Sequence, residues 1–216
     1  MARQERALRT RSALIEAAAE VFHRDGFEQA SLAAISTRAG VSNGALHFHF
    51  ASKTDLAAAV EAAAAFRLGR ITGESGDWAG QDGAAVLQEL IDASHVLLRG
   101  LDEDVVLRAG FALGSARLRV AGSGVDLRGD WQRWVRVVLE RAGGLGALAP
   151  GVSADDAAAL VVASTVGFEV LGGHDARWLA PDTLARFWVL LLPSLVAAPT
   201  CAKLVAAGTG GAPGPA

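Results

Sequence analysis

Cysteine, lysine and tyrosine are scarce in this chain of 216 residues. Cys201 is the only cysteine, so no internal disulfide can form, and a reducing compartment such as the cytosol suits the protein. Long apolar runs are also missing. The longest, 157–168 and 187–198, have twelve residues each, whereas a membrane span needs roughly 20. The basic first residues lead into an amphipathic segment rather than an apolar one, so we expect neither a secretory signal nor a membrane partner.

The sequence also lacks the clusters that enzymes need. The five histidines are scattered, and His47 and His49, two positions apart, point to different faces of a helix. No nucleophile stands with a base, and no glycine-rich phosphate loop follows a strand. We therefore expect no catalytic site, no metal and no cofactor.

Charge is distributed unevenly along the chain. Residues 1–70 carry nine Lys/Arg and seven Asp/Glu, a balance of +2, whereas residues 71–216 carry eleven and sixteen, a balance of −5. Arg3, Arg6, Arg9 and Arg11 stand in the first eleven residues. A basic leading arm on an acidic body fits a protein that presents one end to phosphates.

Apolar residues recur at helical spacing throughout, and no hairpin signal separates runs of β-branched residues. The pattern predicts an all-α fold. The expected helices are 6–24, two short helices within 31–50, one from Ser52 to about residue 70, and further helices at about 83–101, 102–115, 126–143, 153–172 and 181–198.

Residues 31–50 are the most informative segment. Ser31 and Ser42 can each cap a short helix, and Gly40 stands where the chain must turn through a left-handed conformation. The second helix is short, nearly uncharged and rich in small polar groups, and we expect Val41, Ala45, Leu46 and, close by, Phe48 on its buried side. A helix that approaches base edges needs small donors and acceptors. The segment therefore predicts a helix-turn-helix that reads DNA.

This segment resembles the TetR family of transcriptional regulators. The resemblance rests on Gly26-Phe27, the run from Ile35 to Phe50, and Ser52-Lys53. Within the family, Gly44 to Phe50, the opening Met1-Ala-Arg-Gln4 and Gly172-Gly173 look like the γ-butyrolactone receptors and pseudo-receptors of actinobacteria. The resemblance implies a helix-turn-helix domain at 1–52, a lever helix at 52–70 that leads out of it, and a ligand-binding and dimerisation domain at 53–207. The Gly/Pro-rich composition of 208–216 predicts a disordered tail.

The family's DNA contacts transfer to positions in this segment. The resemblance implies that Ser42, Asn43, Gly44 and His47 face the major groove, and that phosphates are bound by Ser31, His49 and Lys53. The alternative is that these residues are ordinary caps and surface polar groups. Two departures stand out: His47 replaces the usual Tyr, and Asn43 replaces the Lys of many receptors. Asn prefers adenine, so the operator is expected to differ from the receptors' usual sequence.

The ligand site is indicated by aromatic and hydroxyl residues in the second half. The resemblance aligns Trp131 with a tryptophan that lines the receptors' pocket, although plain core packing explains it equally well. Ser164 and Thr165 interrupt an apolar helix, and their hydroxyls could bind a ligand carbonyl or bond back to the helix. Phe111, Phe168 and Trp188 are candidates on composition alone. Ala62–Ala65 occupy the lever helix where a polar ligand contact is expected in a true butyrolactone receptor.

The last two long helices are too apolar for an exposed surface, and the resemblance implies a dimer interface there. The expected interface residues are Leu160, Gly167, Leu184, Phe187, Leu191 and Leu195. Dimerisation is also a geometric requirement, because one short helix reads few base pairs and a palindrome needs two.

Together with these patterns, the resemblance implies a homodimeric repressor of palindromic double-stranded operator DNA, released by a small apolar effector. It would act in the cytoplasm, associated with the nucleoid, on antibiotic-biosynthesis or signalling genes. An activator of the same fold and a ligand-binding scaffold without DNA binding are the alternatives.

Overall fold

The computed structural model describes residues 2–73, 78, 80–114 and 124–210. Regular structure in these ranges consists of helices and one isolated β-bridge between Leu148 and Val196, so the all-α prediction is confirmed. Contacts divide the chain into two compact units, Met1–Arg67 with Asp104–Leu127, and Leu68–Glu103 with Arg128–Ala216. The expected domains differ from this division, because most of the lever helix and the helix after residue 104 group with the first unit.

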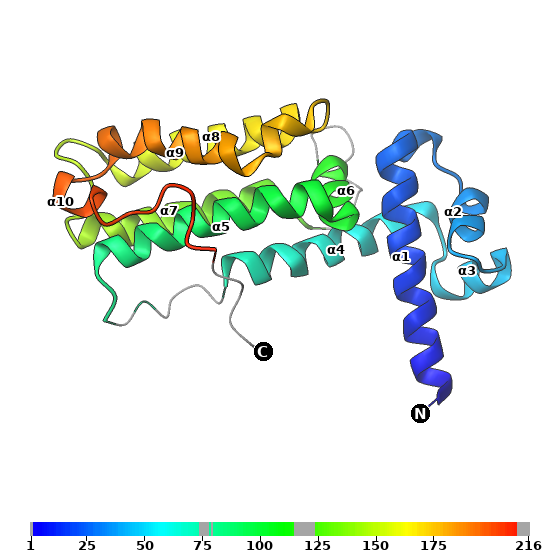
Figure 1. Cartoon of the computed structure of the whole chain (residues 1–216). Coiled ribbons are helices and arrows are strands. Elements are labelled where there is room, and N and C mark those ends of the chain that lie inside the picture. The colour runs from blue at the N-terminus through cyan, green and yellow to red at the C-terminus, as the bar shows by residue number, and fades with distance from the viewer. Residues whose placement is uncertain (1, 74–77, 79, 115–123, 211–216) are drawn as a thin grey trace. The chain divides into compact units, whose positions relative to one another are not determined.

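The first unit contains the helix-turn-helix segment (Figure 1). Its helices are α1 (Ala2–Gln29), α2 (Leu32–Arg38), α3 (Asn43–His49), α4 (Lys53–Thr72) as far as Arg67, and α6 (Val105–Leu113). α1 contacts both α2 and α6, and α2 contacts α3. The α1 core residues Leu14, Ala18 and Val21 recur at helical spacing and are at most 1% exposed, which is why this face is covered by its neighbours.

Serine caps and glycine turns set the boundaries of these short helices, as the sequence predicts. The hydroxyl oxygens of Ser31, Ser42 and Ser52 accept hydrogen bonds from the backbone N–H groups of Ala34, Ala45 and Asp55, at 3.1, 3.2 and 3.0 Å. Gly26 interrupts α1 with a φ of +77°, and Gly40 joins α2 to α3 with a φ of +68°. A side chain at either glycine would be strained.

α4 and α6 approach each other closely within the first unit. A β-carbon at Gly110 would lie 2.3 Å from the β-carbon of Ala64, so only glycine fits this crossing. Asp104 caps α6 by accepting hydrogen bonds from the N–H groups of Val106 and Leu107, and it also forms an ion pair with Arg67 of α4. One carboxylate thus joins the start of α6 to α4.

The second unit is a helical bundle built around α5 (Figure 1). α5 contacts both α8 and α9, and its core residues include Leu87, Ile91 and Leu98. Gly172 ends α8 where a β-carbon would lie 2.5 Å from Leu179 of the short 3₁₀ turn η1. The helices are α5 (Gly83–Glu103), α7 (Leu127–Gly144), α8 (Ala154–Gly172), η1 (Ala176–Leu179), α9 (Pro181–Leu195) and α10 (Ala198–Cys201).

The beginning of the expected disordered tail is ordered. Residues 203–210 run along α5, where Gln88 exchanges two hydrogen bonds with the backbone of Val205. Asp92 accepts hydrogen bonds from the backbone N–H and the hydroxyl of Thr209, and the His95 ring bonds the Ala206 carbonyl at 3.0 Å. The prediction of disorder is therefore wrong for 208–210, because polar side chains one turn apart on α5 satisfy this backbone. Residues 211–216 lie outside the described residues.

Candidate nucleic-acid interface and ligand site

α3 is anchored by very few side chains and leaves most of its surface exposed. Leu46 is fully buried and Phe50, the residue that ends the helix, is 4% exposed. Ser42, Asn43, Gly44 and His47 are all exposed. Asn43 and His47 are four residues apart and therefore neighbours on one side of the helix. The predicted groove-facing residues thus form a continuous exposed face.

Phe48 lies outside the core, contrary to the sequence prediction. Its side chain is 79% exposed, and its ring contacts the edge of the His49 ring at a centroid distance of 5.2 Å. The prediction fails because Leu46 and Phe50 already fill the space beneath α3. Sequence reasoning thus missed an exposed aromatic side chain on the candidate interface.

Asn43 is held from the neighbouring helix. The hydroxyl of Ser36 in α2 lies 2.6 Å from the side-chain oxygen of Asn43 and 3.0 Å from the carbonyl oxygen of Ala33. Ser36 is itself buried. The side chain at the first position of α3 is therefore fixed by α2, which sequence reasoning did not anticipate.

The three predicted phosphate ligands differ in the contacts that they already make within the domain. Ser31 uses its oxygen as an acceptor in capping α2, and its proton remains available for a phosphate oxygen. His49 is half-buried between the rings of Phe48 and Phe50. These positions remain compatible with phosphate binding, which stays a prediction.

Lys53 has a different role from the predicted one. Its ammonium donates hydrogen bonds to the carbonyl oxygens of Phe27, Glu28 and Ala30 at 2.8, 3.0 and 3.0 Å, and it lies 4.6 Å from the centroid of the Phe27 ring. An ammonium has three protons, and all three are engaged. Lys53 therefore fastens the start of α4 to the end of α1, and the structure does not support it as a free phosphate ligand.

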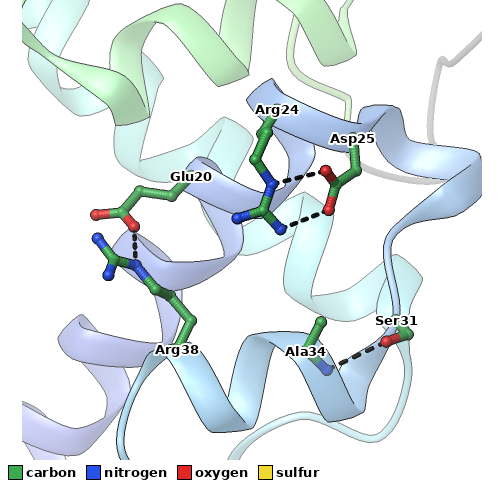
Figure 2. Close-up of polar contacts among 6 residues, drawn as sticks. All are labelled: Glu20, Arg24, Asp25, Ser31, Ala34 and Arg38. Carbon is green, nitrogen blue, oxygen red and sulfur yellow. Dashed lines mark hydrogen bonds and ion pairs between the residues drawn. The ribbon is translucent and has the colours of Figure 1, made fainter.

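Two other cations of this unit, Arg24 and Arg38, are neutralised by neighbouring carboxylates (Figure 2). Arg38 of α2 pairs with Glu20 of α1, and this hydrogen bond lowers the pKa of Glu20. Arg24 binds both oxygens of Asp25 at 2.7 Å, which lowers the pKa of that carboxyl group. These two pairs hold charge within the domain rather than offering it to a ligand.

Arg11 has the exposed, unpaired positive charge that the sequence predicted for Lys53. Its side chain is exposed, and its guanidinium carbon lies 5.3 Å from the centroid of the Phe50 ring at the end of α3. In the described part of the chain it has no carboxylate partner. The four arginines among the first eleven residues had indicated positive charge at this end of the chain.

The candidate ligand residue Trp131 is engaged inside the second unit. It is 1% exposed, stacks on Trp134 with centroids 5.1 Å apart, and donates its indole N–H to the Thr165 hydroxyl at 2.9 Å. Thr165 in turn bonds back to the Val161 carbonyl at 3.0 Å. The structure thus brings together two of the predicted ligand residues, joined to each other.

The remaining ligand candidates do not form one site. Ser164 is half-exposed and bonds back to the Leu160 carbonyl at 2.8 Å, as its alternative interpretation predicts. Phe111 is buried in the first unit, so it does not group with the others. Phe168 and Trp188 both contact the ring of Phe187, with centroids 5.4 and 5.2 Å apart.

Two buried indole groups lack a hydrogen-bond acceptor. Trp134 and Trp188 are 5% and 1% exposed, and among the described residues neither indole N–H has a partner. A buried donor without an acceptor costs about 1–3 kcal/mol, so native proteins rarely leave one unsatisfied. The interior of the second unit thus holds two indole donors without an acceptor among the described residues.

The predicted dimer interface is partly wrong. Leu184, Leu191 and Leu195 are at most 8% exposed and belong to the core of their own unit, because α9 turns them inward. Leu160 is 49% exposed, and Gly167 and Phe187 are half-buried. Leu171, on the same apolar stripe of α8 as Leu160, is 42% exposed, and sequence reasoning missed the other apolar residues that α8 and α9 expose: Val170, Val189 and Leu190.

Across 2–73, 80–114 and 124–210, none of the helices combines the length and the hydropathy that a bilayer crossing requires. No group of three His, Cys, Asp or Glu side chains in the described ranges is arranged to hold a metal ion.

The capped helices α2 and α3, joined at Gly40, form a helix-turn-helix followed by a second helical unit. Residues 14–60 match the family described as "Bacterial regulatory proteins, tetR family". The A-factor receptor protein of Streptomyces griseus is 30% identical over 199 residues, which cover 90% of this chain and 67% of that protein. This chain belongs to the TetR family of transcriptional regulators, as its sequence resemblance predicts.

Solved structures agree with this assignment over nearly the whole chain. A γ-butyrolactone receptor described as ArpA-like has a TM-score of 0.75 at 29% identity, covering 94% of this chain and 95% of that one. CprB of Streptomyces coelicolor, solved in complex with its biological operator sequence, has a TM-score of 0.75 at 31% identity, covering 93% and 94%. The chain is thus a regulator of the γ-butyrolactone receptor type.

Proposed function

We propose that this regulator is a homodimeric repressor that leaves its operator when a small apolar effector binds the second unit. The observation that carries the proposal is the exposed, uncharged face of α3, held from beneath by Leu46 and Phe50. Asn43, Gly44 and His47 would approach base edges, where small polar groups discriminate between base pairs. Ser42 would face the same groove, and phosphates would be bound by Ser31, His49 and, in place of Lys53, Arg11.

A dimer is required because seven residues of helix span only part of one groove. Two copies must present their α3 helices about 34–36 Å apart on a palindrome. The exposed apolar side chains Leu160, Val170, Leu171, Val189 and Leu190 on α8 and α9 supply a surface for a second copy. Contiguous exposed apolar patches mark protein–protein or membrane interaction sites.

The effector would be a mostly apolar molecule that carries hydrogen-bond acceptors. The unpartnered indole groups of Trp134 and Trp188 support this chemistry, since each would gain an acceptor. A γ-butyrolactone-like signal, an antibiotic or a biosynthetic intermediate has such carbonyl oxygens in an apolar frame. The named receptors among the relatives favour the first of these.

Effector and operator would act through α4, which contributes residues to both units. A movement of this lever helix changes how α3 is presented. Because such coupling is reciprocal, operator DNA must weaken effector binding by the same factor. A typical coupling of about 1–3 kcal/mol corresponds to a change of roughly 5–150-fold in operator affinity.

An electrophoretic mobility shift with promoter fragments at low salt is the direct test. We expect a retarded complex that disappears when the effector is added. If no fragment is retarded, the scaffold without DNA binding becomes the better account. Transcription measured in vitro from the same promoter separates a repressor from an activator, because only the repressor lowers transcript yield in the absence of effector.

A further inference from the structure

Phe48 is the one large apolar side chain of α3 that the core of the domain does not bury. Leu46 and Phe50 are 0% and 4% exposed, whereas Phe48 is 79% exposed. Its ring contact in the described chain is with the neighbouring His49, edge to face at 5.2 Å. The folding of the first unit therefore leaves nearly the whole ring in water.

The ring stands within the face that bears the candidate base-reading residues. Gly44 and Phe48 are four residues apart, as are Asn43 and His47, so these two pairs lie side by side along the helix. Gly44 has no side chain, and a β-carbon built there would meet only the Ser42 hydroxyl, at 3.9 Å. The space one turn before Phe48 is thus open for the ring and for a close approach of the helix.

A large apolar ring among polar groups needs an apolar partner when its face is covered. The base edges of the major groove carry donors and acceptors, and the C5-methyl group of thymine is the apolar group among them. We propose that Phe48 contacts a thymine methyl group in each half-site and makes that position specific for thymine. This inference rests on the proposed function, because it requires α3 to enter the groove.

The methyl contact should change operator affinity by a predictable factor. Burying one methyl group against the ring changes affinity by about fourfold, and the two half-sites together by about 15-fold. Hydrogen bonding is not involved, so the effect depends on the methyl group and not on the oxygen or nitrogen atoms of the base. Deoxyuridine differs from thymidine in that methyl group alone and is therefore the matched probe.

The experiment uses the full chain and an operator selected from a pool of random duplexes. Each thymine of a half-site is replaced in turn by deoxyuridine, symmetrically in both half-sites, and affinity is measured by fluorescence anisotropy. We expect one position at which the wild-type protein loses about 15-fold. Phe48→Ala should bind the thymine operator more weakly and should not distinguish thymine from uracil there, whereas Phe48→Leu should retain part of the difference.

Phe66→Ala is the matched control, because Phe66 is also exposed, at 71%, and belongs to α4 of the same unit. This variant should discriminate between thymine and uracil like the wild type. Uracil substitutions that are neutral at every position would overturn the Phe48 contact while leaving DNA binding intact. So would a Phe48→Ala protein with the full thymine preference. Failure of the wild-type chain to select any duplex would instead overturn the proposed function.

Discussion

Ser36 and Asn43 are 2.6 Å apart at their side-chain oxygens, which ties the first residue of α3 to the middle of α2. Ser36 has a single proton, and the Ala33 carbonyl oxygen at 3.0 Å competes for it. When the proton goes to Ala33, the Asn43 amide can turn its N–H towards Ser36. Its oxygen and its second N–H are then free for the two hydrogen bonds that Asn makes with adenine.

Replacing Ser36 with Ala should therefore reduce sequence discrimination more than affinity. The amide of Asn43 would lose its orientation, and the preference for adenine at one operator position would fall by part of the roughly 1–3 kcal/mol that such a pair supplies. Anisotropy titrations against operators with single base changes measure this. In an Asn43→Ala background, Ser36→Ala should have no further effect on discrimination. Independent, additive losses would show that the two residues do not act as a unit.

Removing the charge of Lys53 should lower stability, whereas removing the charge of Arg11 should change the salt dependence of DNA binding. Lys53→Ala leaves the carbonyl oxygens of Phe27, Glu28 and Ala30 without their donor, and should lower the free energy of unfolding by about 1–3 kcal/mol. Arg11→Gln should leave stability nearly unchanged but reduce the slope of log affinity against log salt by about 1.

Chemical denaturation and salt titrations of operator binding separate these two effects. Arg24→Gln is the control for Arg11, because Arg24 is an exposed arginine of the same helix but is paired with Asp25. It should leave the salt dependence unchanged. A Lys53→Ala protein with normal stability and a reduced salt slope would restore Lys53 as a phosphate ligand.

Three of the buried tryptophans, Trp131, Trp134 and Trp188, should divide by whether their N–H is paired. Trp134→Phe and Trp188→Phe remove donors without an acceptor in the described chain, so the effector-free protein should be as stable as the wild type or slightly more so, yet bind effector more weakly. Trp131→Phe breaks the bond to Thr165 and should be destabilising by about 1 kcal/mol. Thermal unfolding with and without effector gives both quantities. Unchanged effector binding in Trp134→Phe and Trp188→Phe would exclude these donors from the ligand site.

Much of the DNA-reading segment was predictable because its determinants are local. Ser31, Ser42 and Gly40 act within a few residues of themselves, so their caps and turn follow from sequence. The roles of Lys53 and Phe48 were not predictable, since they depend on which carbonyls and side chains come from α1 and on how little space lies beneath α3. The prediction of the dimer-interface residues failed for a similar reason. An apolar helix such as α9 has two apolar faces, and sequence alone does not say which one its own unit covers.

Acid should weaken the first unit through His23. Partial desolvation of this ring, and then the positive charge of Arg108 on α6, lower its pKa in the folded state. Above the ordinary histidine pKa both folded and unfolded chains are neutral here. As the pH falls below that value, the unfolded chain binds a proton that the folded chain resists, so stability decreases until the lowered pKa is passed. His23→Gln should show a shallower loss between these two pKa values in urea denaturation. Equal slopes in both proteins would contradict this role.

Leu190 provides the sharpest test of the dimer, because it is 80% exposed on α9 and its replacement leaves the core of the unit intact. Leu190→Glu places a charge in the apolar surface of α8 and α9 and should yield a monomer by sedimentation velocity. The two α3 helices would then bind independently, and operator affinity should fall by about 10²–10⁴-fold. Leu8→Glu, at a 62% exposed leucine of α1, is the matched control and should remain dimeric. A Leu190→Glu protein that stays dimeric and binds its operator normally would place the interface on another surface.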